Sequence, residues 1–342
     1  MSIKQKINRL PVFVRALIIS VVFAVFLVVV QILISGGTIS GYISKIIILV
    51  GINMILTLSL NIATGYLGQL PLGHAGFMAV GAYTSAIILR AVPADSAAAL
   101  FPVTLIAGGI MAAIFGLIIG IPALRLKGDY LAIITLGFGE IIRVIITNID
   151  SVLGFDFTYG ARSLKNIPKV TTFIGTFLCV AITCLLIYTL IHSRQGRAIL
   201  AVRDNEIAAE SCGINITLYK TLGFTISAFF AGIAGALYAS YLGILNPASF
   251  GFMKSIEILV MVVFGGMGSM IGSLISATVL TVLPEALREF ESFRMLVYSL
   301  LLIVIMIFNH SDKMKRFKTV AIDKIKAVFS KKAVKGAENE QH

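Results

Sequence analysis

Residues 16–44 read ALIISVVFAVFLVVVQILISGGTISGYIS and contain no charged side chain. A helix needs about 20 mainly apolar residues to cross the hydrocarbon core of a bilayer. This run is longer than that, and longer than the apolar core of a secretory signal, which has roughly 7–15 residues. We therefore expect a retained membrane span here rather than a signal peptide that is removed.

The composition of the whole chain also indicates a membrane protein. Of the 342 residues, 58% are hydrophobic and only 13% are charged, whereas soluble domains carry about 25% charged residues. Further apolar stretches follow at about 42–64, 74–89, 99–124, 129–147, 170–191, 217–241, 255–270, 271–287 and 293–309. We expect an all-α, polytopic membrane helix bundle of about ten transmembrane helices, some of them interrupted by glycine. Because the stretches are continuous rather than alternating, they exclude an outer-membrane barrel.

Basic residues at the two ends of the chain predict its topology. Lys and Arg cluster in residues 1–15 and 310–342, and such residues accumulate on the cytoplasmic side of membranes. Both termini are therefore expected in the cytoplasm, which requires an even number of spans. With about ten spans, residues 192–220 also lie inside and residues 148–169 lie outside. The net charge of +12 thus reflects topology, and nucleic-acid binding is not expected.

These observations divide the chain into a basic cytoplasmic N-terminus (1–15), a transmembrane domain (16–309) and a basic cytoplasmic tail (310–342). In the tail, apolar residues recur at helical spacing at Phe317, Ala321, Ile325 and Val328. This pattern suits a helix lying on anionic membrane lipid. A disordered basic tail is the alternative.

The sequence lacks the short motifs of nucleotide phosphate loops, zinc proteases, redox cysteine pairs and serine hydrolases. Its four histidines and three cysteines are too scattered to suggest a ligand cluster. We therefore expect no metal site, no cofactor bound by this chain and no enzymatic activity.

Glycine and proline interrupt the apolar pattern between residues 61 and 83, NIATGYLGQLPLGHAGFMAVGAY. The candidate residues in this segment are Gly65, Gly68, Pro71, Gly73, His74 and Gly76. Because proline removes a backbone donor and glycine weakens a helix, an unwound segment here must be shielded by protein or line a wet cavity. Small residues also let helices approach closely. Lining of a transport pathway and close packing both remain possible interpretations.

A second such segment, residues 255–277, reads SIEILVMVVFGGMGSMIGSLISA and contains Gly265, Gly266 and Gly268. Charged residues inside the spans are few. Glu140 and Arg143 are three residues apart on one helical face and can neutralise each other. Lys254 and Glu257, three residues apart at a helix start, are expected to form an interfacial pair. We expect structural charge pairs, with direct transport chemistry as the alternative.

Residues 192–220, HSRQGRAILAVRDNEIAAESCGINITLYK, are unusually charged for this chain. An ion-coupled carrier usually shows intramembrane carboxylates or half-helices that bind the coupling ion, and these are scarce here. A permease driven by an external motor needs none, but it needs a cytoplasmic segment through which force is applied. Residues 192–220 have the predicted location and the composition for that role.

The first part of this stretch, HSRQGRAILAVRDNEIAAESCGIN, resembles the coupling loop of bacterial ABC importer permeases, in particular the branched-chain amino acid permease family of the LivM type. RLKGDYLAIITLGFGEIIRVI, NIATGYLGQLPLGHAGFMAVGAY and SIEILVMVVFGGMGSMIGSL resemble that family's segments in the same order. The resemblance covers residues 49–308. It implies a multi-pass inner-membrane permease for leucine, isoleucine and valine, paired with a second related permease. It also implies two cytoplasmic ATPase subunits that hydrolyse ATP, and an extracytoplasmic substrate-binding protein.

Against the family's E-A-A-x-x-x-G pattern, Ala208, Ala209 and Gly213 match, whereas Ile207 replaces the glutamate. Two alanines keep a short helix thin enough to enter a groove on a partner, and a glycine can end that helix with a positive φ. Neighbouring charges supply directional pairs at the rim of the groove. The candidate ATPase-coupling residues are Arg203, Asp204, Asn205, Glu206, Ala208, Ala209, Glu210 and Gly213. The alternative for this stretch is a solvated connector.

Substrate identity stays open between related transporters, because specificity in such importers lies largely in the binding protein. A permease for urea or short-chain amides and one for sugars are the alternatives within this superfamily. An ion-coupled secondary transporter is the alternative outside it.

Overall fold

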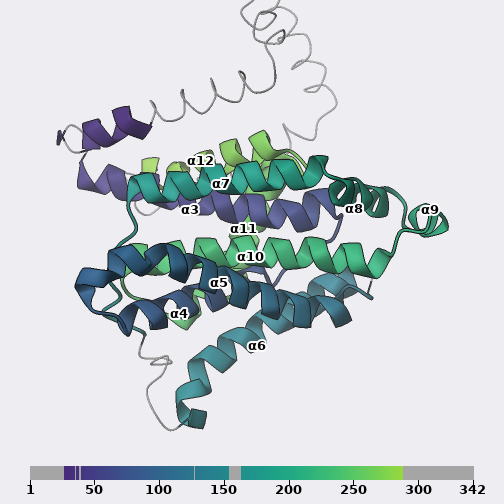
Figure 1. The fold of residues 1–342 in the computed structure, drawn as a ribbon, viewed down its shortest axis with the longest axis horizontal. Helices are drawn as coiled ribbons and strands as arrows, with labels where there is room; N and C mark the ends of the chain where they lie inside the picture. The colour runs from purple at the N-terminus through teal and green to yellow at the C-terminus, as the bar shows by residue number, and fades with distance from the viewer. Residues whose placement is uncertain (1–26, 35, 38–39, 127, 154–162, 288–342) are drawn as a thin grey trace, which may run out of the picture. The chain divides into compact units, whose positions relative to one another are not determined.

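The computed structural model of the chain describes residues 27–34, 36–37, 40–126, 128–153 and 163–287. Within these ranges every regular element is a helix, and one isolated bridge pairs Leu164 with Leu245. The predicted all-α class is therefore confirmed for the described part of the chain (Figure 1).

Most of the predicted apolar stretches are helices in the structure. In chain order the elements are α3 (Gly41–Asn61), the π-helical η1 (Ile62–Tyr66), α4 (His74–Arg90), α5 (Ala94–Ala123), α6 (Asp129–Leu153), α7 (Phe173–His192), α8 (Arg194–Asp204), α9 (Glu206–Ser211), α10 (Ile216–Leu242), the 3-10 helix η3 (Pro247–Phe250), α11 (Phe252–Gly265) and α12 (Met270–Ala286). Within the described ranges, six helical segments are long and apolar enough to cross a membrane, and α12 is a shorter apolar helix.

Several predictions fall on residues that the structure does not describe. They concern the N-terminal segment 1–15, most of the external loop 148–169, the span 293–309 and the tail 310–342. The count of about ten spans and the side on which the termini lie stay predictions.

The uncharged run at residues 16–44 does not form one helix in its described part. Residues 27–34 are helical, a turn follows at Gly36 and Gly37, and α3 begins at Gly41. Gly37 has a φ of 72°, a conformation that ends helices, and Ser40 caps α3 by accepting a hydrogen bond from the Ile43 N–H. Because neither feature involves a charge, hydropathy alone could not place this break.

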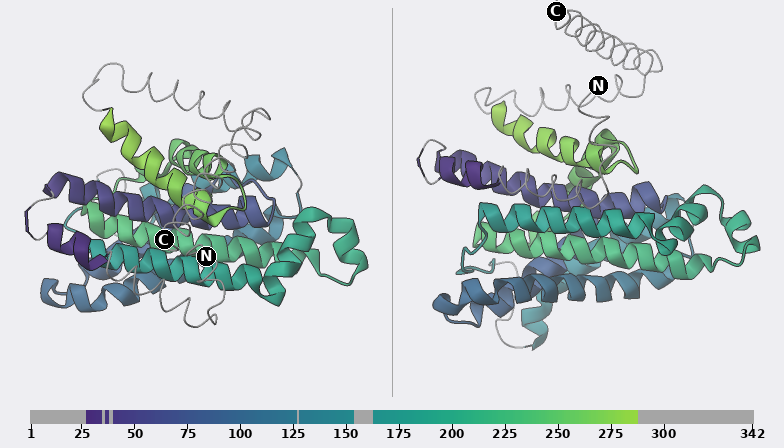
Figure 2. Two further views of the ribbon diagram at one scale, coloured as in Figure 1. Left: turned by 90° about the horizontal axis from the view of Figure 1, so that it is seen from above. Right: turned by 45° about the horizontal axis from the view of Figure 1, so that its top comes forward.

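Residues 39–285 form one compact unit, and α10 lies at its centre. It packs against α3, α4 and α5 (Figures 1 and 2). Small residues allow this close approach: a Cβ on Gly232 of α10 would lie 2.6 Å from the Gly108 carbonyl oxygen of α5. Since lipid offers little hydrophobic driving force between helices, backbone-to-backbone packing of this kind holds such bundles together.

The outer helices of this unit expose most of their side chains. α3 and α10 are the most buried spans, whereas α6, α7 and α11 are mainly exposed. Many of the exposed side chains are large and apolar, such as Ile141 on α6 and Leu185 on α7. This is the surface expected of helices that face lipid or another membrane subunit.

Candidate coupling site at the α8–α9 hairpin

Two short helices, α8 and α9, lie at one end of the bundle, past the end of α7 (Figure 1). Each begins at a polar side chain that caps it. Ser193 Oγ accepts a hydrogen bond from the Gly196 N–H at 3.1 Å, and Asn205 Oδ1 accepts one from the Ala208 N–H at 3.1 Å. Such caps satisfy backbone donors at a helix start. The stretch is therefore two helices joined at Asn205, and we call residues 193–213 the α8–α9 hairpin.

The hairpin ends in a sharp reversal of the chain at Gly213. The Gly213 N–H donates to the Glu210 carbonyl at 2.9 Å, and the Ile214 N–H donates to the Ala209 carbonyl at 3.1 Å. Together with a Gly213 φ of 79°, these bonds form a Schellman motif. A Cβ at Gly213 would meet nothing within 4 Å. Glycine is thus required here for backbone conformation, not for space.

The outward face of α9 presents Ala208, whereas Ala209 packs inside the permease with only 4% of its surface exposed. Ile207, which stands where the family pattern has glutamate, is 77% exposed, and Glu210 is exposed as well. The exposed residues of α9 therefore include Ile207, Ala208 and Glu210. The Ala209 side chain is turned away from this exposed face.

A buried ion pair joins α9 to α10. Lys220 Nζ lies 2.6 Å from Glu206 Oε1, and the lysine side chain is 4% exposed while the glutamate side chain is 27% exposed. Buried charges of this kind are tolerated only with a close partner. Glu206 thus fixes the position of α9 on the bundle.

A second connection joins α8 to η1. The Arg203 guanidinium donates from Nη1 to the Gly65 carbonyl oxygen at 3.0 Å, and its Nε and Nη2 donate to Asp204 Oδ1 at 3.0 and 2.8 Å. Asp204 therefore orients an arginine that binds the backbone of η1. A Cβ at Gly68 would lie 2.8 Å from Arg203 Cγ, so this side chain fills the space beside the irregular segment after η1.

The two glycine-rich segments of the sequence meet beside Arg203. Asn61 Oδ1 accepts a hydrogen bond from the Gly268 N–H at 2.8 Å, and Asn61 Nδ2 donates to the Ser269 carbonyl at 3.3 Å. A Cβ on Gly65 would collide with the Gly268 nitrogen and with Asn61 Oδ1. We call Asn61, Gly65, Gly268 and Ser269 the glycine junction. It connects the end of α3 to the turn between α11 and α12.

Several other candidate glycines shape turns or close contacts. Gly68, Gly266 and Gly268 have φ values of 73°, 84° and 83°, which favour glycine. A Cβ on Gly265 would lie 2.7 Å from the Gly272 carbonyl group, so these two glycines let α11 and α12 pack tightly.

The segment that leads into α4 packs on α6. A Cβ on Gly73 would lie 2.7 Å from the Thr135 carbonyl carbon, and one on Gly76 would lie 3.0 Å from Gly139 Cα. Pro71 is buried in the same irregular segment. For Gly73 and Gly76 the geometry is that of helix packing.

His74 is a core residue, 1% exposed. One of its ring nitrogens, Nε2, lies 2.8 Å from Ser59 Oγ. Because Ser59 Oγ donates its one hydrogen to the Leu56 carbonyl oxygen at 2.7 Å, it is left to accept a hydrogen bond from a protonated Nε2. The next residue, Ala75, donates its N–H to Ser255 Oγ at 3.0 Å, which ties α4 to α11.

Both ion pairs expected from the sequence are present. Arg143 Nε lies 2.6 Å from Glu140 Oε2 on α6, and Lys254 Nζ lies 3.0 Å from Glu257 Oε2 on α11. All four side chains are less than half exposed. Pairing of this kind lowers the cost of charge inside a membrane.

Two residues that hold this end of the molecule together were not predicted from the sequence. Lys220 and Asn61 were not among the candidates, although both are polar residues in or beside apolar runs. A polar side chain within a span usually faces the bundle interior and finds a specific partner. Asn61 lies within an apolar stretch, so its contact inside the bundle could have been predicted on this ground.

A family model described as "Branched-chain amino acid transport system / permease component" matches residues 42–308. The chain belongs to this permease family. The permease is 35% identical over 342 aligned residues to the high-affinity branched-chain amino acid transport system permease protein LivM of Escherichia coli strain K12, with 90% of this chain and 74% of that protein covered. The Salmonella typhimurium LivM protein is 36% identical over 292 residues, with 75% and 66% covered.

The permease is also 29% identical over 155 residues to LivH of Salmonella typhimurium, a permease protein of the same named transport system, with 44% of this chain and 48% of LivH covered. Similarity to both LivM and LivH indicates that an ABC system of this kind has a second, related permease subunit. No solved structure matches the chain.

Proposed function

We propose that this chain is a transmembrane permease subunit of a bacterial ABC importer that moves leucine, isoleucine and valine across the inner membrane. Membership of the permease family and the identity to LivM proteins support the substrate class. The membrane-capable helices support a multi-pass location. In this proposal the chain crosses the membrane about ten times, and both termini and the α8–α9 hairpin lie in the cytoplasm.

The proposed complex contains a second related permease, two cytoplasmic ATP-binding subunits and an extracytoplasmic substrate-binding protein. The ATP-binding subunits bind and hydrolyse ATP, and this chain binds no cofactor and catalyses no reaction. The absence of a phosphate-loop motif from the sequence supports that division of labour. The permease supplies the pathway and the surface on which an ATPase subunit acts.

The proposed coupling role rests on the two contacts that attach the hairpin to the rest of the bundle. Its outer side exposes Ile207 and Ala208. Its inner side is joined to α10 through the Glu206–Lys220 pair, and to the glycine junction through Arg203. A displacement of the outer side is therefore passed to α10, α3 and the α11–α12 turn through contiguous contacts. ATP-driven movement of a bound subunit would thereby change the packing of these helices.

Replacing Ala208 by arginine tests the docking surface. Because Ala208 is exposed, the substitution leaves the permease fold intact, but a long charged side chain cannot enter a groove that fits alanine without a buried, unpaired charge. We expect the ATPase subunits to be lost on co-purification, and leucine uptake by proteoliposomes containing the complete importer to fall at least ~10-fold, as for a loss of about 1.4 kcal/mol or more of binding free energy.

The matched control is Ile182→Phe, at a half-exposed position on the outer face of α7. It should leave co-purification and uptake near the wild-type level, because lipid adapts to a larger apolar side chain. Isoleucine and valine, but not urea or a sugar, should compete with labelled leucine. Wild-type co-purification by the Ala208→Arg variant would show that the ATPase docks elsewhere.

A further inference from the structure

The first turn of α11 carries an ion pair within the thickness of the bundle. η3 and α11 together form one candidate membrane span of 19 residues, Pro247–Gly265, so the first turn of α11 lies within that span and not at its end. The last residue of α11, Gly265, lies at the end that contains the hairpin. Its first turn lies near the middle of α6, because a Cβ on Gly251 would lie 3.7 Å from Glu140 Oε1. Lys254 and Glu257 are therefore charged groups at mid-depth.

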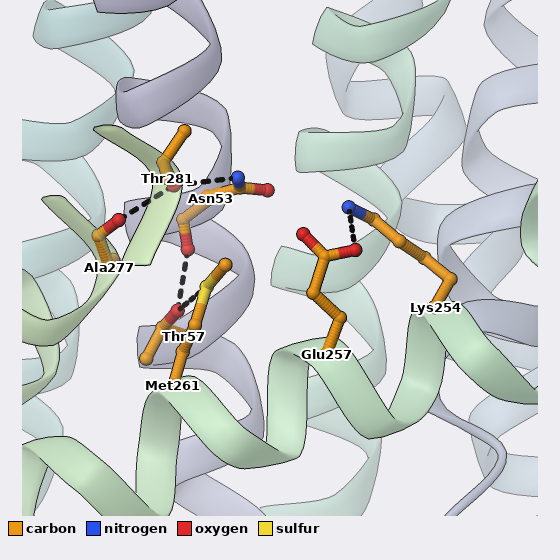
Figure 3. Close-up of polar contacts among 7 residues, drawn as sticks. All are labelled: Asn53, Thr57, Lys254, Glu257, Met261, Ala277 and Thr281. Carbon is orange, nitrogen blue, oxygen red and sulfur yellow. Dashed lines mark hydrogen bonds and ion pairs between the residues drawn. The ribbon is translucent and has the colours of Figure 1, made fainter. Parts of the chain in front are cut away.

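A buried hydrogen-bond acceptor points toward this ion pair. Asn53 of α3 is 2% exposed, and its Nδ2 donates to Thr281 Oγ1 at 2.9 Å. Its Oδ1 accepts no hydrogen bond from the described part of the chain. Figure 3 shows this oxygen directed toward Lys254 and Glu257. A buried acceptor without a donor is unfavourable, so this arrangement favours a donor that arrives from outside the chain.

α3 and α11 are in contact at this level. One helical turn beyond Asn53 and Glu257, the Thr57 hydroxyl lies 3.5 Å from Met261 Sδ, with both residues buried (Figure 3). The relative position of Asn53 and the ion pair is therefore fixed by packing. Glu257 is 42% exposed on its side chain and Lys254 is 15% exposed. A half-exposed carboxylate at this depth is too costly to face lipid and is expected to face a wet path or another subunit.

The three side chains are complementary in charge and hydrogen bonding to the main-chain groups of an amino acid. Lys254 supplies a cation for an α-carboxylate. Glu257 and Asn53 Oδ1 supply two acceptors for an α-ammonium group. The positive end of the α11 dipole lies beside Lys254 and adds to the attraction for a carboxylate. A zwitterion can also replace the Lys254–Glu257 pair contact for contact, so no charge is left unpaired while it is bound.

We infer that Asn53, Lys254 and Glu257 form a transient binding site for the charged main-chain groups of an amino acid crossing the permease. This inference rests on the proposed function and extends it by assigning substrate contacts to this chain. Because leucine, isoleucine and valine share these groups, the site accepts all three and leaves side-chain selection to other parts of the importer. The site loads when the ion pair opens and empties when it forms again.

Two double-mutant cycles test the inference in the complete importer reconstituted in proteoliposomes. The first cycle contains Lys254→Gln, Glu257→Gln and the double variant. The second contains Glu140→Gln, Arg143→Gln and their double variant, and it is matched in the signs of the two charges and in their spacing along the helix. The measured quantity is labelled leucine delivered per ATP hydrolysed, after size-exclusion chromatography has established assembly of each complex.

For a substrate site, the double Lys254→Gln/Glu257→Gln variant should be at least as impaired as either single variant, about 10-fold or more below wild type. Both charges of leucine then lose their charged partners. For a purely structural pair, the double variant should recover toward wild type, because it removes the unpaired charge that each single variant leaves. We expect that recovery in the Glu140–Arg143 cycle.

Recovery in the Lys254–Glu257 cycle would overturn the inference. Since a single variant with an unpaired buried charge can fail to assemble, the neutral double variant is the deciding one. Failure of the wild-type importer to deliver leucine would count against the proposed function. Wild-type delivery combined with a recovered Lys254→Gln/Glu257→Gln variant would count against the binding site alone.

Discussion

Replacing Gly65 by valine is expected to prevent recovery of folded permease. The added side chain would collide with the Gly268 nitrogen and with Asn61 Oδ1, and its Cβ would lie 2.8 Å from Gly268 Cα. These atoms are mostly backbone held by the Asn61 hydrogen bonds, so they cannot move aside as the end of a flexible side chain could. The expected cost is about 3 kcal/mol or more in stability. The yield and monodispersity of detergent-solubilised protein measure it.

Gly137→Val is the matched control for this prediction. Gly137 lies in α6 and is exposed, and a Cβ there would meet nothing within 4 Å. Valine also has a better helix propensity than glycine, so the variant should be recovered at about the wild-type level. Equal yields of the Gly65 and Gly137 variants would mean that η1 and the α11–α12 turn are not in contact.

The positions of the helices could be predicted from the sequence because apolar length is a local property. α5, α7 and α10 fall on predicted stretches with shifts of a few residues at their ends. The glycine interruptions after residue 61 were also visible. The residues that these glycines contact could not be predicted, because Gly65 and Gly268 are about two hundred residues apart and no local pattern relates them.

The coupling stretch could be located from the sequence, but not the face of each residue. α9 has six residues, fewer than two turns, so a period of 3.6 residues cannot separate its faces. Ala208 and Ala209 were therefore predicted to have the same role, whereas the structure exposes Ala208 and buries Ala209. Similarly, the sequence indicated only that Lys220 is a positive charge on the cytoplasmic side. In the structure, the reversal of the chain at Gly213 places Glu206 next to Lys220.

Replacing Glu206 by glutamine is expected to uncouple the hairpin from the bundle. The Lys220 side chain is 4% exposed, so its ammonium group would stay buried after losing the carboxylate 2.6 Å away. Removing one partner of a buried pair typically costs about 3–5 kcal/mol. The water that reaches the partly exposed Glu206 lowers that cost here. We expect leucine delivered per ATP to fall at least ~10-fold, with faster proteolysis within the hairpin.

The companion variants separate the buried charge from the loss of an attachment. Lys220→Met leaves a glutamate that water can solvate, so its effect should be smaller than that of Glu206→Gln. The double variant leaves no buried charge and should also be milder than Glu206→Gln alone. If Lys220→Met proves as damaging as Glu206→Gln, burial of the ammonium group is not the cause. The order expected for this pair is opposite to that for Lys254 and Glu257, because neither Glu206 nor Lys220 is assigned a contact with the substrate, whereas Lys254 and Glu257 both are.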